Sequence, residues 1–229
     1  MLTNNNQKDI KMNKLLTALA VSAVALSASA AHVKTGWNTT LTGGFSQNKM
    51  KTKGLPGTTR NKSKNSGSFN LGLRLGHTWA MQEKYFAGVN LLAGYNFGDE
   101  KFTEEAGQWA LHHKPRFNFG LGLVGGTCVS ETVNTYLALN FLREQSRVTT
   151  KFADGTPSNK DNFRTYTLTP LLGVNGRISE KMSWLAEAGY KFNLSKSGLK
   201  KTFAPGTYNK NNIKGPKGFV ANVGVTYHF

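Results

Sequence analysis

Apolar and polar residues alternate with a period of two along most of the chain after residue 35, and no stretch shows the 3.6-residue apolar period of a helix. This alternation is typical of β-strands, because successive side chains of a strand point to opposite faces. The sequence therefore predicts an all-β fold with eight strands. We place them at residues 36–45, 68–79, 85–97, 116–126, 136–144, 165–177, 184–194 and 219–229.

The fifth of these segments is irregular. Leu137, Leu139 and Phe141 form its apolar row, but Tyr136 then falls on the polar face. A β-bulge near Tyr136 would return this ring to the apolar side, so a bulge is predicted there.

The faces opposite the apolar rows carry mainly Gly, Asn, Thr and Ser. A soluble barrel packs bulky apolar side chains inside and covers its exterior with charged residues, which is the opposite arrangement. Small polar residues fit a narrow interior, and a continuous apolar exterior is stable only in hydrocarbon. The pattern predicts an antiparallel, up-and-down transmembrane β-barrel. The alternative, a secreted β-sandwich, would need solvated charges on its outer faces, and these strands carry almost none.

Aromatic residues cluster at both ends of the apolar rows, as expected at the two interfaces of a membrane. One end holds Trp37, Trp79, Tyr85, Trp184, Tyr227 and Phe229; the other holds Phe45, Phe69, Tyr95, Phe97, Phe117, Phe141, Tyr166, Tyr190, Phe192 and Phe219. A strand rises about 3.3 Å per residue, and at a tilt near 40° the segment from Trp37 to Phe45 would span roughly 20 Å along the membrane normal. That distance is close to the apolar thickness that such barrels span.

The connections alternate between short and long. Residues 80–84, 129–134 and 179–182 form short links, and residues 47–66, 98–116, 145–163 and 195–217 form long polar ones. Short periplasmic turns and long extracellular loops are typical of bacterial outer-membrane barrels. An even number of strands then places both ends of the barrel in the periplasm.

The amino-terminal segment has the features of a secretory signal. Lys8, Lys11 and Lys14 precede an apolar run over residues 15–26, which is followed by the small-x-small sequence at residues 28–30. The run of about 12 residues is shorter than the roughly 20 that a spanning helix needs. We therefore predict a cleaved signal peptide over residues 1–30 and a barrel domain over residues 31–229, with translation starting at Met1 or Met12 and cleavage after Ala30 or Ala31.

The formal net charge is +17, and most of the excess lies in the first and fourth long connections. The basic residues there are Lys49, Lys51, Lys53, Arg60, Lys62, Lys64, Lys196, Lys200, Lys201, Lys210, Lys214 and Lys217. They form either a patch for lipopolysaccharide phosphates, sulfated glycans and host polyanions, or a solvated surface next to an anionic leaflet. No nucleic-acid binding is expected, because stacking aromatic residues are not interleaved with them.

A few charged residues share the polar, inward face of the strands. They are Arg74, Glu144, Arg177, Glu187 and Lys191. Since an unpaired buried charge is costly, these side chains are expected to form ion pairs in the lumen. The alternative is a small gated pore, although the interior of an eight-stranded barrel is just wide enough to be filled by side chains.

The signal sequence, the eight alternating strands, the loop rhythm and the final "VTYHF" together resemble the small outer-membrane β-barrels of Gram-negative bacteria, such as OmpA-type barrels, OmpX, Ail and the opacity-like proteins. The resemblance implies Sec-type export and integral insertion in the outer membrane. It also implies that Val225, Tyr227 and Phe229 match the carboxy-terminal signal read by the barrel-assembly machinery.

These features predict a non-enzymatic, monomeric surface protein without a cofactor, in contact with outer-membrane lipids and lipopolysaccharide. Its expected role is structural support of the envelope, with adhesion or polyanion binding through the basic loops. The alternatives are a small porin and a lipid-modifying enzyme. An enzyme would need a Ser nucleophile with a positioned His, or clustered Asp and His, and no such set is evident from the positions of His77, His112, His113 and His228.

Overall fold

In a computed structural model of the protein, the described residues are 33–52, 62–81, 84–98, 100–103, 109–152, 157–195 and 213–229. Within those ranges no helix is long and apolar enough to cross a membrane. The predicted signal peptide at residues 1–30 lies outside the described residues, so it stays a prediction.

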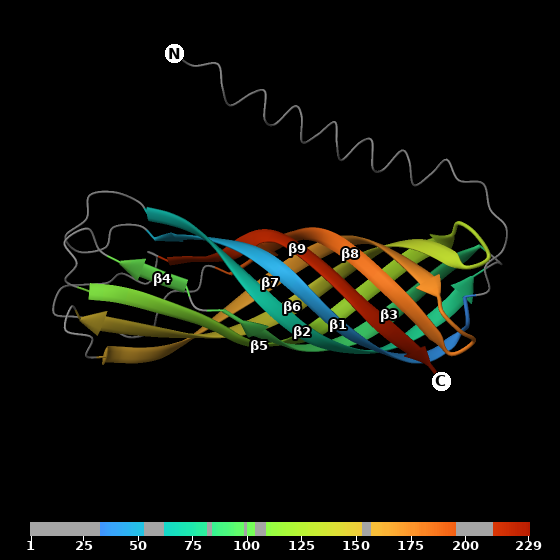
Figure 1. Ribbon diagram of the computed structural model, residues 1–229, viewed down its shortest axis with the longest axis horizontal. Coiled ribbons are helices and arrows are strands. Elements are labelled where there is room, and N and C mark those ends of the chain that lie inside the picture. Colours follow the sequence, from blue (N-terminus) through green and yellow to red (C-terminus); the bar gives the residue numbers. More distant parts are fainter. Residues whose placement is uncertain are drawn as a thin grey trace, which may run out of the picture.

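Eight long strands form one closed barrel, which Figure 1 shows from the side. They are β1 (Gly36–Thr52), β2 (Lys62–Met81), β3 (Tyr85–Phe97), β5 (Trp109–Cys128), β6 (Val133–Phe152), β7 (Pro157–Arg177), β8 (Met182–Asn193) and β9 (Ile213–His228). Each is antiparallel to the next, and β9 pairs with β1 to close the sheet. A ninth, short strand, β4 (Glu100–Thr103), pairs with β5 beyond the end of β3. The prediction of an eight-stranded antiparallel barrel is confirmed.

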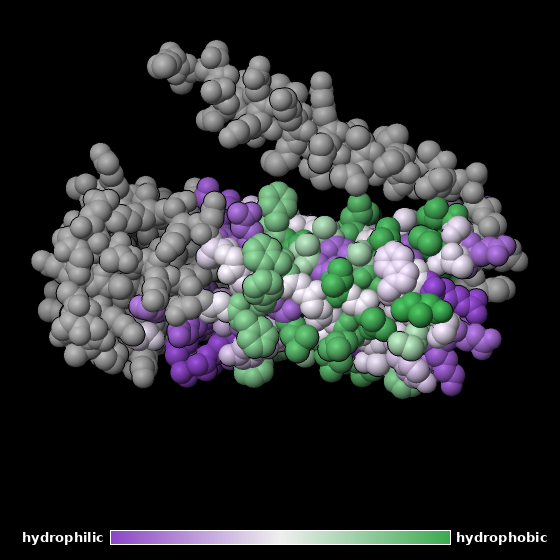
Figure 2. Space-filling model, in the orientation of Figure 1, coloured by the Kyte–Doolittle hydropathy of each residue, from purple (hydrophilic) through white to green (hydrophobic). Residues whose placement is uncertain are grey.

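The exterior of the barrel is apolar and the interior is polar. Phe69 and Leu137 on the outside are each 66% exposed, whereas Thr40 and Thr167 on the inside are buried. On the face shown in Figure 2, the apolar side chains gather in a band across the middle of the barrel, with hydrophilic residues at both of its borders. A folded surface with this much exposed hydrocarbon is stable in a lipid environment, where alternating faces meet lipid and lumen.

The extracellular aromatic belt is built from cross-strand ring contacts, which link neighbouring strands. The ring pairs are Phe45 with Phe69, Tyr95 with Phe117, Phe141 with Tyr166 and Tyr190 with Phe219. Their centroid separations run from 5.0 to 6.0 Å, within the range of favourable aromatic contacts. The contacts join the eight long strands in four pairs, so each of these strands contributes a ring to the belt predicted from sequence.

The strands continue well past the apolar band. β1 and β2 stay paired up to Thr52 and Lys62, and β6 and β7 up to Lys151 and Pro157. The described parts of the predicted long loops at 47–66 and 145–163 are thus strand, and His112 lies in β5 rather than in a loop. Outside hydrocarbon both faces of a hairpin can be polar, so alternation no longer marks the strand although its hydrogen bonds continue.

The bulge predicted near Tyr136 is wrong. The register of β6 is continuous there with both neighbours, and Tyr136 lies opposite Gly173 of β7. Its ring points into the barrel and is buried. The register shifts in the pairings of β6 lie elsewhere: with β5, between Pro115 and Asn118, where the missing N–H of proline interrupts the ladder, and with β7, between Thr150 and Lys151.

Candidate functional sites: the polar lumen and the basic outer surfaces

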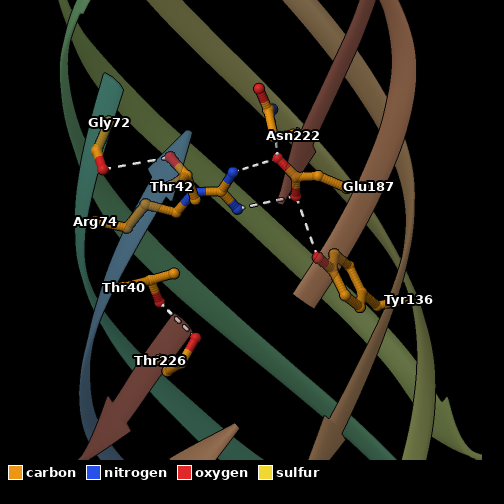
Figure 3. Close-up of polar contacts among 8 residues, drawn as sticks. All are labelled: Thr40, Thr42, Gly72, Arg74, Tyr136, Glu187, Asn222 and Thr226. Atoms are coloured by element: carbon orange, nitrogen blue, oxygen red, sulfur yellow. Dashed lines mark hydrogen bonds and ion pairs between the residues drawn. The ribbon is translucent and has the colours of Figure 1, made fainter. Parts of the chain in front are cut away.

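An ion pair between β2 and β8 crosses the lumen (Figure 3). Arg74 Nη1 donates a hydrogen bond of 3.0 Å to Glu187 Oε2, and Arg74 Nη2 donates to Glu187 Oε1. The side chain of Glu187 has no solvent exposure. This fork-to-fork geometry is the strongest arrangement available to an arginine and a carboxylate.

Two further donors satisfy the same carboxylate. The Tyr136 hydroxyl donates to Glu187 Oε2 at 3.1 Å, and the Asn222 amide donates to Glu187 Oε1 at 2.8 Å. Figure 3 shows that these side chains converge on Glu187 from different strands. Tyr136 was not predicted to be a lumen residue. The signal for this role is the position of Tyr136 on the polar face of its strand, which also suggested a bulge.

A second ion pair lies farther toward the extracellular end. Lys191 Nζ is 3.2 Å from Glu144 Oε1, and the Thr167 hydroxyl is 3.5 Å from the same oxygen. Arg74, Glu144 and Lys191 line one polar cavity of about 90 Å³, which has room for a few water molecules. The structure thus brings together four of the five charged residues that were placed in the lumen from sequence.

Arg177 is the exception. It lies at the last position of β7, next to the turn at 178–181, and its side chain is exposed. The prediction that it joins a buried lumen ion pair is wrong. Its position at the end of β7 places it at the periplasmic rim, where the barrel opens to water and a charge needs no partner.

The basic residues of the first and fourth long connections meet at the seam between β1 and β9. Lys49 lies directly opposite Lys217, and Lys51 directly opposite Lys214. Lys49 and Lys217 are exposed. Lys62 and Lys64 lie at the start of β2, beside the end of β1. The remaining predicted members, Lys53, Arg60, Lys196, Lys200, Lys201 and Lys210, lie outside the described residues.

One Ser–His contact that the sequence did not predict lies at the periplasmic end. Ser183 Oγ of β8 lies 3.0 Å from His228 Nε2 of β9. No carboxylate contact to His228 occurs in the described part of the chain, so the orienting third group of a catalytic triad is not seen there. Across the same described ranges, no group of three or more His, Cys, Asp and Glu could hold a metal ion.

Comparison with known proteins gives the family. The model of the "outer membrane protein beta-barrel domain" matches residues 16–229, which is nearly the whole chain. The chain belongs to this family. It is an integral protein of a Gram-negative outer membrane, as the resemblance implied. A comparison with curated proteins found no significant match.

Several solved structures are similar to this chain at low sequence identity. Ail of Yersinia pestis, solved in complex with the heparin analogue sucrose octasulfate, is 14% identical over 85% of this chain and 99% of Ail, with a TM-score of 0.41. Neisserial surface protein A is 12% identical over 83% of this chain and 97% of its own, with a TM-score of 0.47. The outer membrane protease OmpT of Escherichia coli is 12% identical over 88% of this chain and all of OmpT, with a TM-score of 0.42. These outer-membrane proteins thus include a protease as well as surface proteins.

Proposed function

We propose that this barrel is a non-enzymatic surface protein that supports the outer membrane and binds sulfated or phosphorylated polyanions at the β1–β9 seam. The observation that carries the proposal is the register, which places Lys49 opposite Lys217 and Lys51 opposite Lys214. Four lysines from distant parts of the sequence are therefore adjacent, at the end of the barrel that carries the long connections.

Like charges directly opposite each other destabilise a strand pair. The cost is modest at water-exposed positions such as Lys49 and Lys217, because solvent and salt screen the repulsion. A bound polyanion would replace that repulsion with attraction. Lysine is a compact and strongly hydrated point charge, so it suits salt-dependent contacts with flexible chains of sulfate or phosphate groups.

The geometry of the described residues also supports a non-enzymatic role. The Ser183–His228 contact lacks a carboxylate partner, and the charged groups of the lumen are engaged in ion pairs with one another. A catalytic site would need a nucleophile, its base and an orienting group held together near a concave surface.

The proposal is tested by heparin affinity of the purified, detergent-folded barrel. We expect binding to weaken with added salt, and to fall about 10- to 30-fold in the variant Lys49→Gln, Lys51→Gln, Lys214→Gln, Lys217→Gln. That estimate takes roughly 0.5 kcal/mol for each of the four charge contacts.

The matched control is Lys84→Gln, because Lys84 is exposed at the periplasmic end. It should bind heparin as the unmodified protein does. Unchanged, salt-insensitive binding by the seam variant would contradict the proposal.

A further inference from the structure

Three arginines form a second basic surface on the opposite side of the barrel from the β1–β9 seam. Arg143 and Arg147 lie on β6. Arg164 lies on β7 opposite Gln145, which is the residue midway between the two β6 arginines. In the strand order, β6 is four positions from β1 in either direction around the barrel. Diagonal neighbours of this kind have Cα atoms about 7–8 Å apart, so long side chains can reach a common ligand. We call these three residues the arginine face.

The first member of the arginine face lies within the extracellular aromatic belt. Arg143 is opposite Phe119 of β5 on one side and Tyr166 of β7 on the other. Its guanidinium lies 5.3 Å from the centre of the Phe119 ring, a cation–π distance. The ring contact keeps the cation at the level where acyl chains meet headgroups rather than letting it extend into water.

None of these cations has an acidic residue as its cross-strand partner between β6 and β7. The cross-strand partners of Arg143, Arg164 and Arg147 are Tyr166, Gln145 and Asn162. Glu144, the acidic neighbour of Arg143 in sequence, points inward and binds Lys191. On β5, Lys114 is opposite Arg147, and Arg116 lies in the register shift next to Phe117. The outward faces of β6 and β7 therefore present three arginines without an acidic cross-strand partner, from the belt toward the extracellular end.

We infer that the arginine face binds a phosphate of a phosphorylated glycolipid in the outer leaflet. The position of Arg143 in the aromatic belt indicates the class of ligand. A group that contacts Arg143 at this level belongs to a membrane lipid, and its charge must be negative to complement the arginines. Guanidinium groups bind phosphate oxygens in bidentate fashion, and the interaction is stronger near hydrocarbon than in water. The inference is independent of the polyanion proposal, which concerns lysines on the other side of the barrel.

The inference is tested by native mass spectrometry of the whole barrel in detergent with lipid A carrying both phosphates. We expect the unmodified barrel to retain the lipid, and the variant Arg143→Gln, Arg147→Gln, Arg164→Gln to bind it at least tenfold more weakly. Replacing the same three residues with Lys should restore only part of the affinity, because an ammonium lacks the bidentate geometry. Dephosphorylated lipid A should bind weakly to every variant.

The control is Lys49→Gln, Lys51→Gln, Lys217→Gln, which removes the same charge from the seam. It should keep lipid A binding and bind heparin more weakly. The arginine variant should bind lipid A more weakly and keep heparin binding, so the two proposals fail separately. Folding of each variant is checked by heat-modifiable migration. If the triple arginine variant does not fold, Arg164→Gln alone, at an exposed position, should still lower affinity several-fold. Equal binding of phosphorylated and dephosphorylated lipid, or undiminished binding by the arginine variants, would overturn the inference.

Discussion

Glu187 is the residue on which the polar contacts of the lumen converge. A carboxylate without solvent exposure is costly to bury, and only well-placed donors offset that cost. Here the donors are two nitrogens of Arg74, the phenol of Tyr136 and the amide of Asn222. The pair ties β2 to β8 across the interior, so its loss should be felt by the whole barrel.

Glu187→Gln is expected to lower the free energy of unfolding by about 3–5 kcal/mol, because it leaves Arg74 as an uncompensated buried charge. Urea titration of the barrel folded in lipid vesicles measures this. Adding Arg74→Met to Glu187→Gln should recover part of the loss, since both charges are then gone.

The control for that prediction is Arg177→Gln. Because Arg177 is exposed at the periplasmic rim, its replacement should change stability by no more than about 0.5 kcal/mol. A loss as large as that of Glu187→Gln would mean that Arg177 takes part in the lumen network after all.

At the scale of the elements, β6 and β7 fit together through a large and a small residue in the lumen. The Tyr136 ring lies over Gly173, and a Cβ added at Gly173 would be 2.3 Å from Tyr136 Cζ and 2.6 Å from its hydroxyl oxygen. That space is what lets the phenol reach Glu187. The glycine therefore supports the pairing of β6 with β7 and the polar network together.

Gly173→Ala should destabilise the barrel by about 1–3 kcal/mol, as expected when a well-packed interior is overfilled. Gly43→Ala is a suitable control, because a Cβ at Gly43 meets nothing within 4 Å. Urea unfolding of both variants in the same lipid measures the difference. Equal stability of the two would contradict the proposed packing role of Gly173.

At the scale of the whole molecule, the seam between β1 and β9 makes a barrel out of a sheet. It runs from Asn38 opposite His228 to Thr52 opposite Ile213. Beyond His228, the Phe229 N–H donates to the Trp37 carbonyl at 3.1 Å, and the Phe229 ring meets the Tyr227 ring edge-on at 5.3 Å between centroids. Without this seam, two strand edges would expose unpaired backbone groups to hydrocarbon.

Phe229→Ser is predicted to reduce insertion into the outer membrane several-fold in cells, because Phe229 is proposed to be part of the assembly signal together with Tyr227 and Val225. Membrane fractionation followed by heat-modifiable migration measures the folded fraction. The same variant refolded in detergent should still form a barrel, since Phe229 is 73% exposed and adds little packing within the chain. Normal insertion in cells would leave the assembly signal without support.

The alternation of side chains determined most of the fold by itself. Small polar residues such as Thr40 on one face and apolar residues such as Leu41 on the other fixed which side of each strand meets the lumen. A strand has only two faces, so this information is local. The strand ends were not predictable in the same way, because alternation fades where both faces meet water while the hydrogen bonds of β6 and β7 continue.

What only the tertiary structure decided is which residues become partners. Arg74 and Glu187 are 113 positions apart, and barrel closure and register bring them together. The same holds for Lys49 beside Lys217, and for Arg143 between Phe119 and Tyr166. Sequence determined the face of each side chain, because the face alternates from one residue to the next. Which residues become cross-strand partners depends on the register between two strands, and the sequence of one strand alone does not determine that register.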